Sequence, residues 1–453
     1  MQKGGATVRK KLGIIVKLIL VAALILLFTG CFSTSAEELY QLPQLSDEYV
    51  QLQSLFNKVL AANTENPARY SAPTAGSYRQ PVQFEDIDGD GQKEAVAFFS
   101  IPGDDMPLKV YLYEIDDGEY YEAAVIEGSG TDIRSIEYAD MDGDGQNEIL
   151  VGWQIASGVS MLTGYSINDY QVAQLFSSDY SNYTVCDMSK SNGRDVLVVG
   201  TASVDSQISA TVYSLMDEGE IVSSSAKLSS GIGTSTIIKT GGLADGKQGA
   251  FIESTINETT IVTDVLAYRS EGLVNTSIRS ASGVSQGTAR TYSIYSTDID
   301  NDGVIEIPSP VQLESQSDTV NYWLIEWYAF DSSGYKTLKS TTYHNFSDSW
   351  YLTLPEDWEG RITARRESAV SGERTLVFSL IKSSGDITDF LAVHTLSGTN
   401  RENRANLEGR KIIAQRNNVI YAQEILVNAE TFPLTINEDI ITEGFHIIYS
   451  ELN

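Results

Sequence analysis

The chain has 453 residues, of which 42% are hydrophobic and 20% charged, so it is long enough to form two or three domains with apolar cores. Its 61 acidic residues outnumber its 31 basic residues and give a formal net charge of −30. Because nucleic-acid binding depends on positive side chains that displace counterions from phosphates, this charge excludes nucleic acid as an expected partner. The same acidity suits a protein that works among divalent cations.

The first 31 residues have the order of a signal peptide: a basic segment, a short apolar run and a processing site. The apolar run covers residues 18–28 and is too short to span a bilayer. It ends in Phe28-Thr29-Gly30-Cys31, which resembles the lipobox of bacterial lipoproteins. This resemblance implies that Cys31 is acylated and anchors an extracellular protein to the outer face of the bacterial cytoplasmic membrane. An uncleaved signal anchor is the alternative.

Residues 32–74 are expected to form a tether followed by an amphipathic helix. Residues 32–36 read as the tether. Apolar residues then recur at helical spacing between Asp47 and Ala62, and Ser46 stands at the N-cap position. The apolar residues are Tyr49, Leu52, Leu55, Phe56, Val59 and Leu60. We expect this helix to pack on the domain that follows.

Three later segments share the pattern Asp-x-Asp-x-Asp-Gly-x-x-Glu. Alternate residues of a tight loop turn their oxygen atoms to one centre, the Gly closes the loop, and the next residue offers its carbonyl. The predicted ligands are Asp86, Asp88, Asp90, Gln92 and Glu94 in the first loop, Asp140, Asp142, Asp144, Gln146 and Glu148 in the second, and Asp298, Asp300, Asp302, Val304 and Glu306 in the third. Oxygen donors in this number predict Ca²⁺ as the cofactor, with up to three ions bound.

These loops are not EF-hands, because the twelfth position, which an EF-hand fills with Glu, holds Ala97, Val151 and Ser309. The residues that follow the first two loops, Ala95–Phe99 and Ile149–Trp153, read as strands. Metal loops between strands, repeated three times, resemble the FG-GAP/VCBS repeat of integrin-like β-propellers. The resemblance implies a mainly β fold of four-stranded blades.

An apolar strand followed by an acidic or glycine-containing turn recurs about every fifty residues, the length of one blade. The five strands are Val110–Tyr113, Leu162–Tyr165, Val212–Leu215, Val265–Tyr268 and Trp327–Phe330. Residues 187–196 and 243–250 look like degenerate copies of the loop, and we expect no metal there. We therefore predict a propeller of about five blades within residues 75–347.

Residues 348–453 follow a different pattern and predict a small α+β domain. Strands are expected at Thr375–Ile381, Phe390–Thr395 and Asn418–Ala422. An amphipathic helix is expected over Glu438–Leu452, because apolar residues recur there at helical spacing.

The sequence offers no positive evidence for catalysis. The three histidines, His344, His394 and His446, lack the spacing of metal ligands. A Gly-x-Ser-x-Gly match at Ser285 lacks the preceding strand and following helix that a nucleophile elbow requires. Cys186, in an apolar stretch, is expected to be a buried free thiol.

We therefore expect a cell-surface lipoprotein whose Ca²⁺-stabilised propeller binds a protein or a glycan without catalysing a reaction. The alternative is an extracellular polysaccharide-active enzyme built on the propeller. A sensor of external Ca²⁺ is a third possible function.

Overall fold

The computed structural model describes residues 47–449 apart from 63–65, 117, 169–170, 190, 202–206, 217–218, 280, 314–320 and 368–369. The predicted signal peptide, Cys31 and the tether lie outside the described residues. The described part of the chain is mainly β, with six antiparallel sheets and three α-helices. Among the helices described, none combines the length and the apolarity needed to cross a membrane.

The second, third and fourth sheets are meanders of four consecutive strands, which is how a propeller blade is built, and the first sheet adds one short strand to such a meander. The first contains β1 (Arg69–Tyr70), β2 (Val82–Glu85), β3 (Glu94–Ser100), β4 (Leu108–Asp116) and β5 (Glu119–Gly128). The second contains β6 (Asp132–Ala139), β7 (Glu148–Ala156), β8 (Val159–Asn168) and β9 (Gln171–Asp179). The third contains β10 (Asn182–Cys186), β11 (Asp195–Val199), β12 (Ser209–Leu215) and β13 (Ile221–Lys227). The fourth contains β14 (Ile232–Gly242), β15 (Gln248–Ile256), β16 (Thr260–Arg269) and β17 (Gly272–Asn275).

The last two sheets each have five strands. The fifth contains β18 (Glu306–Gln312), β19 (Trp323–Phe330), β20 (Lys336–Asn345), β21 (Trp350–Thr353) and β27 (Phe445–Ile447). The sixth contains β22 (Ile362–Arg366), β23 (Glu373–Ile381), β24 (Ile387–Leu396), β25 (Arg410–Arg416) and β26 (Val419–Ile425). The helices are α3 (Asp47–Ala61), α4 (Arg401–Ala405) and α5 (Glu438–Gly444), and 3₁₀ turns cover Gln286–Thr288 and Glu356–Trp358.

This architecture confirms the predicted fold class. The five recurring strands of the sequence lie in β4, β8, β12, β16 and β19, one in each of the first five sheets. The three strands predicted near the C-terminus lie in β23, β24 and β26 of the sixth sheet. That sheet, with α4 and α5, is the α+β part of the chain.

Two predicted domain limits do not coincide with the sheets. β1 pairs with β3, so the first sheet begins at Arg69, before the predicted start at residue 75. β21 pairs with β20, so the fifth sheet continues across the predicted boundary between residues 347 and 348. The composition of the sequence changes near this boundary, but the pairing of strands continues across it.

The helix predicted over Glu438–Leu452 is wrong for residues 445–449, and residues 450–452 lie outside the described part of the chain. α5 ends at Gly444, and Phe445 begins β27, which pairs with β21. This pairing buries Phe445, whose ring centroid lies 5.4 Å from that of Trp350 and 5.3 Å from that of Tyr421. Tertiary pairing therefore overrides the helical periodicity of the apolar residues.

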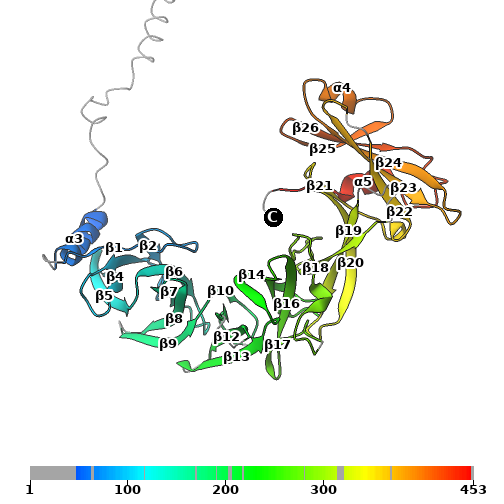
Figure 1. The fold of residues 1–453 in the computed structure, drawn as a ribbon. Helices are drawn as coiled ribbons and strands as arrows, with labels where there is room; N and C mark the ends of the chain where they lie inside the picture. Colours follow the sequence, from blue (N-terminus) through cyan, green and yellow to red (C-terminus); the bar gives the residue numbers. More distant parts are fainter. Residues whose placement is uncertain are drawn as a thin grey trace, which may run out of the picture.

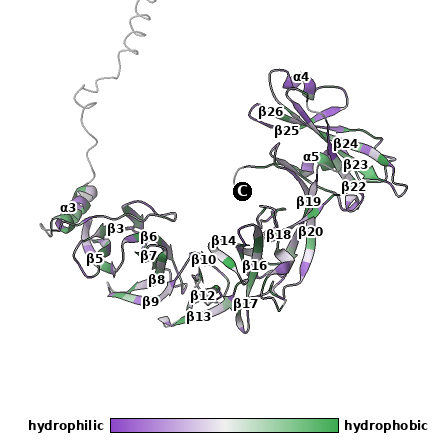
Figure 2. Ribbon diagram, in the orientation of Figure 1, coloured by the Kyte–Doolittle hydropathy of each residue, from purple (hydrophilic) through white to green (hydrophobic). Residues whose placement is uncertain are grey.

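The sheets follow one another along an arc (Figure 1). The first strands of the second, third and fourth sheets, β6, β10 and β14, lie on the concave side, and β9, β13 and β17 lie on the convex side (Figure 1). Five hydrophobic clusters each join one sheet to the next, from the first and second sheets through to the fifth and sixth. Figure 2 shows the hydrophobic residues distributed along the strands in this way, whereas α4 is hydrophilic.

The central strands are apolar on both faces because each lies between two layers. In β3, Ala95, Ala97 and Phe99 pack against α3, while Val96 and Phe98 pack against the second sheet. Residues of a strand alternate between its faces, so a strand covered on both sides reads as a continuous apolar run. Every residue of β3 is accordingly buried.

Helix α3 covers the outer face of the first sheet, as the sequence predicted. Leu52, Phe56 and Val59 are buried there, and the ring of Phe56 contacts that of Tyr113 at 5.4 Å between centroids. The two ends of the arc stand apart (Figure 1). α3 therefore occupies the face that a neighbouring blade would cover in a closed ring, in the manner of the caps that end repeat proteins.

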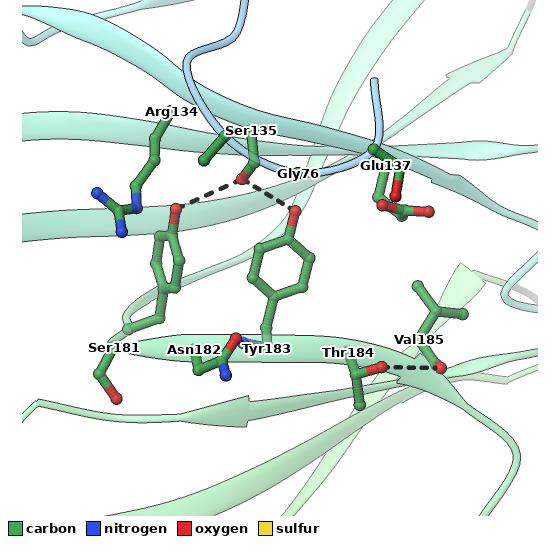
Figure 3. Close-up of a pocket in the computed structure, with 12 residues that line it drawn as sticks. Gly76, Arg134, Ser135, Glu137, Ser181, Asn182, Tyr183, Thr184 and Val185 are labelled. Atoms are coloured by element: carbon green, nitrogen blue, oxygen red, sulfur yellow. Dashed lines mark hydrogen bonds between the residues drawn. The ribbon is translucent and has the colours of Figure 1, made fainter. Parts of the chain in front are cut away.

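A pocket of about 400 Å³ opens between the second and third sheets, beside β6 and β10 (Figure 3).

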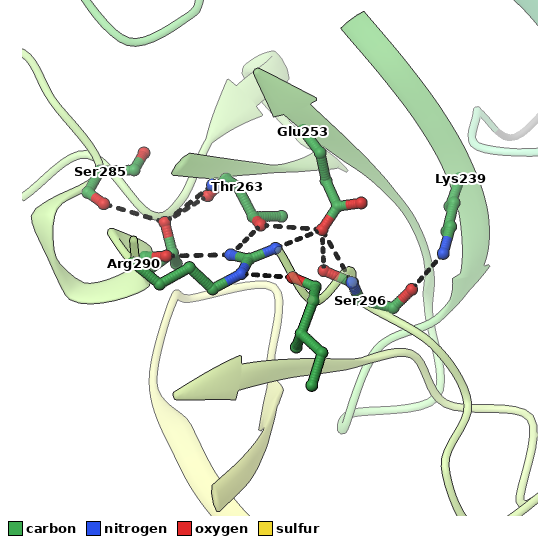
Figure 4. A network of polar contacts seen from close by, with 8 residues as sticks. Lys239, Glu253, Thr263, Ser285, Arg290 and Ser296 are labelled. Atoms are coloured by element: carbon green, nitrogen blue, oxygen red, sulfur yellow. Dashed lines mark hydrogen bonds and ion pairs between the residues drawn. The ribbon is translucent and has the colours of Figure 1, made fainter. Parts of the chain in front are cut away.

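A polar network lies inside the fourth sheet (Figure 4). Its centre is an ion pair between Arg290 and Glu253, with 2.6 Å between Nη2 and Oε1 and side chains only 1% and 0% exposed. Arg290 belongs to the irregular segment between β17 and β18, which the network binds to β15 and β16.

Candidate metal-binding loops

The first loop joins β2 to β3 and folds around the side chain of Asp86. Oδ1 of Asp86 accepts a hydrogen bond from the backbone N–H of Gly89 at 2.9 Å, and Oδ2 accepts one from Gly91 at 3.0 Å. Asp88 and Asp90 each accept a bond from the N–H two residues further along, at 3.1 and 2.6 Å. One carboxylate oxygen from each of the three Asp residues thereby comes within 4.8 Å of the others.

The second and third loops repeat this arrangement. Asp140 accepts bonds from the N–H groups of Gly143 and Gly145 at 2.6 and 3.1 Å. Asp298 accepts bonds from Asp302 and Gly303 at 3.0 and 2.8 Å. The close oxygens come from Asp140, Asp142 and Glu148 in the second loop and from Asp298, Asp300 and Asp302 in the third.

Not every predicted ligand belongs to these close groups. Glu94, Asp144 and Glu306 lie outside them. The N–H groups of Gln92, Gln146 and Val304 donate to the preceding Asp at 2.6, 2.8 and 2.8 Å. The inward direction of their carbonyl groups stays a prediction.

The final Glu of each loop begins the next strand and is buried. Oε2 of Glu94, Glu148 and Glu306 accepts a bond from the backbone N–H of Ile87, Met141 and Ile299 at 2.5, 2.8 and 3.1 Å. Burial raises the pKa of all three carboxyl groups to about 7, and the nearby Asp residues add to the effect.

The chemistry of these donors fits a hard cation. Glu306 is 0% exposed, and its Oε1 has no hydrogen-bond partner among the described residues. Desolvation, followed by effects of neighbouring acids, also raises the pKa of Asp88 and Asp142. A divalent cation would satisfy the unpaired oxygen and neutralise the clustered carboxylates at the same time.

Backbone hydrogen bonds join the first loop to the second, and the second to the loop of the third sheet, a feature that the sequence did not reveal. Asn147, in the second loop, donates from its backbone N to the carbonyl of Ile87 at 2.7 Å and from its side chain to the carbonyl of Asp86 at 2.8 Å. Arg194 donates in the same way to the carbonyl of Asp140 at 2.7 Å. The order of one loop is therefore coupled to the packing of two sheets.

The close contact between loops explains the glycine at position 89. Its φ of +77° favours glycine, and a Cβ atom there would lie 2.4 Å from the carbonyl oxygen of Gly145. The third loop has Asn301 at the equivalent position, with a φ of +61°, a conformation that Asn tolerates better than most residues.

In the two degenerate loops, the remaining carboxylates are bound by donors of the protein itself. Asp195, which stands where the other loops have the final Glu, is 0% exposed. It accepts bonds from the N–H groups of Met188 and Ser189 at 2.7 and 2.6 Å and from the hydroxyl of Ser214 at 2.5 Å. In the other loop, Asp245 accepts bonds from Ser332 and pairs with Lys247. Both carboxylates are satisfied by protein groups.

The third loop differs from the first two by a lysine from β20. Nζ of Lys339 lies 2.7 Å from Oδ2 of Asp302, and this contact lowers the pKa of the carboxyl group. The ammonium group competes for an oxygen that a metal ion would use. Sequence reasoning missed it because Lys339 is far from the loop in the chain.

Three other residues considered as candidates in the sequence are buried and contact other residues of the protein. Ser285 is 0% exposed and donates to Oδ1 of the buried Asp264 at 2.5 Å, so its hydroxyl is not presented to solvent. His394 is 3% exposed and lies between Glu373 and Glu424, at 3.3 and 3.1 Å. Cys186 is a free, buried thiol, as predicted, and burial raises its pKa to about 12.

Comparison with known proteins identifies part of the repeat. Residues 86–151, which span the first two loops and the strands between them, match the FG-GAP-like repeat family. The described fold and this match define the chain as a mainly β protein of propeller-type blades that carries an FG-GAP-like repeat.

More distant comparisons add little. No curated protein matches the chain. Among solved structures, the chain is similar to an exotype rhamnogalacturonan lyase, YesX, with a TM-score of 0.24 and 15% sequence identity. The match covers 73% of this chain and 57% of the lyase, so the chain spans less than two thirds of that protein. A similarity of this size carries no argument about activity.

Proposed function

We propose that this protein is a lipid-anchored, cell-surface module whose successive sheets are stabilised by Ca²⁺ and which binds a protein or a glycan without catalysing a reaction. The observation that carries the proposal is the repeated loop: in all three loops the first Asp accepts a backbone hydrogen bond from the residue five positions later, and the first two loops contact one another. Asp86, Asp88, Asp90 and Glu94 would hold one ion, and the corresponding residues of the second and third loops would hold two more.

Ca²⁺ has a structural role in this proposal. Its charge would offset the repulsion among the acidic residues of each loop and thereby favour the ordered loop over the unfolded chain. Because loop order is coupled to contacts between sheets, bound ions would also stiffen the arc. The concave side would then present a fixed surface to a ligand, which is the arrangement that scaffold-borne binding sites require.

The position at the cell surface rests on the lipobox-like sequence ending in Cys31. We expect Cys31→Ser to shift most of the protein from the membrane fraction to the soluble fraction of the cells or to the medium, because two or three acyl chains anchor a protein firmly and none would be attached. Fractionation with immunoblotting measures this shift, and Cys186→Ser is the matched control. Unchanged membrane retention of the Cys31 variant would argue for the uncleaved signal anchor.

The binding role is tested with the purified chain from residue 32 onward, in Ca²⁺ and in EDTA. Capture of defined glycans or of a surface protein in Ca²⁺, with loss of capture in EDTA, supports the proposal. Depolymerisation of a plant or cell-wall polysaccharide by the same preparation would contradict the non-enzymatic part and favour the polysaccharide-active alternative.

A further inference from the structure

The pocket between the second and third sheets has the properties of a ligand site that the metal loops do not explain. It has a volume of about 400 Å³ and lies beside β6 and β10, the concave-side strands of their sheets. Residues 75–77, which precede β2, form part of its wall. The pocket is therefore assembled from three parts of the chain that are far apart in sequence.

A β-bulge in β6 directs polar side chains toward this pocket. The pairing of β6 with β7 shifts register between Ile133 and Ser135, which leaves Arg134 as the extra residue. Such bulges re-aim side chains and are common beside functional sites. The segment before β2 binds at the same place, since the N–H of Ala75 donates to the carbonyl of Arg134 at 2.7 Å.

The pocket has a floor of tyrosine hydroxyl groups. The hydroxyl of Tyr183 donates to Oγ of Ser135 at 3.0 Å, and that of Tyr180 lies 3.5 Å from the same oxygen (Figure 3). The two rings meet edge to face with 5.3 Å between centroids. Ser135 fixes both rings, so the pocket combines rigid aromatic surface with hydroxyl groups.

Charged groups of opposite sign stand at the two ends. Figure 3 shows the guanidinium group of Arg134 at one end and the carboxylate of Glu137 at the other, with Tyr183 between them. Glu137 is half-buried, and its carboxylate accepts no hydrogen bond from the part of the chain that the structure describes. Burial raises the pKa of Glu137.

From this geometry we infer that the pocket binds one or two units of a neutral saccharide, with a vicinal pair of ligand hydroxyl groups donating to the carboxylate of Glu137 and with Arg134 donating to ligand oxygens at the other end. The inference deepens the proposed binding role by assigning its site and its ligand class.

Several features favour a saccharide over other ligands. The two charges cancel within the pocket, so it suits neither a phosphate nor a simple cation. Six of its twelve lining residues carry a hydroxyl group, two of them tyrosines, which differs from the mainly apolar walls of a site for a hydrophobic molecule. An unpaired carboxylate needs ligand donors, and adjacent sugar hydroxyl groups supply two of them.

The test uses the purified chain in Ca²⁺ and a panel of methyl hexopyranosides and their disaccharides, with binding measured by ligand-observed NMR and calorimetry. We expect Glu137→Gln to weaken binding of the best member at least tenfold, because one acceptor oxygen becomes a donor. Arg134→Gln should also weaken binding. Glu119→Gln, an exposed carboxyl group on β5, is the matched control and should leave affinity unchanged. Thermal melts of each variant show that the fold is retained.

The possible outcomes separate this inference from the proposed function. Saccharide binding that survives both Glu137→Gln and Arg134→Gln would overturn the pocket assignment and leave a glycan-binding protein with its site elsewhere. No binding of any panel member by folded, Ca²⁺-loaded protein would overturn the saccharide inference, while a protein ligand found by capture would still satisfy the proposed function.

Discussion

Arg290→Met is expected to destabilise the protein by about 3–5 kcal/mol, because it leaves the carboxylate of Glu253 charged and buried without its partner. The guanidinium group of Arg290 also donates to the carbonyl groups of Ile294 and Thr288, at 2.6 and 3.0 Å, and to the hydroxyl of Thr263 at 3.0 Å. Glu253 already has one oxygen, Oε2, without a hydrogen-bond partner among the described residues. The substitution therefore removes hydrogen bonds from buried groups that water cannot reach.

The effect is measured as the shift of the urea midpoint in Ca²⁺-containing buffer. Arg365→Met is the control. Arg365 pairs with Asp389 at 2.6 Å, and both side chains are more than a third exposed, at 35% and 38%. Partly exposed pairs contribute up to about 1 kcal/mol. A double variant, Arg290→Met with Glu253→Leu, should recover much of the lost stability, because no isolated charge remains. Equal midpoints for Arg290→Met and Arg365→Met would show that the network does not hold the segment before β18.

Chelation of Ca²⁺ is expected to produce a second large loss of stability. A site with a dissociation constant of about 10⁻⁴ M contributes about 1.8 kcal/mol in 2 mM Ca²⁺, and three such sites together contribute about 5 kcal/mol. EDTA should therefore lower the melting temperature by several degrees, and Mg²⁺ should restore little of it, because Mg²⁺ gives up its water ligands reluctantly.

Asp88→Asn and Asp142→Asn make this prediction specific. Asparagine keeps the Oδ1 acceptor for the N–H of Asp90 or Asp144, bonds of 3.1 and 3.2 Å, but removes the charge. In Ca²⁺ each variant should melt below the unaltered protein. In EDTA each should melt at the same temperature or higher, since repulsion within the loop falls. Asp132→Asn, an exposed carboxyl group outside the loops, is the control. A loss of stability that is equal in Ca²⁺ and EDTA would mean that these residues act without an ion.

The three acidic loops could be predicted from sequence because their geometry is local. Nine residues fix the spacing of the acidic side chains, and the hydrogen bonds that the carboxylates of Asp86 and Asp140 accept come from residues at most five positions away. Strand β3 was equally predictable, since burial on both faces leaves a continuous apolar run.

Features that depend on distant residues could not be predicted in this way. The contact of Lys339 with Asp302 spans 37 residues of sequence. The pocket needs residues 75–77 to meet β6 and β10. β27 forms because β21 offers a free edge to Phe445, which no periodicity within 438–452 reveals. The contacts between loops, such as that of Asn147 with Asp86, likewise arise from the stacking of sheets.

The most direct test of the central claim is a count of bound Ca²⁺ by calorimetric titration and by metal analysis after equilibrium dialysis. The unaltered protein should bind three ions, the third most weakly because Lys339 contacts its loop. Asp88→Asn, Asp142→Asn and Asp300→Asn should each remove one ion. Failure of the unaltered protein to bind Ca²⁺, or a stoichiometry that these substitutions do not change, would contradict the assignment of the three loops as Ca²⁺ sites.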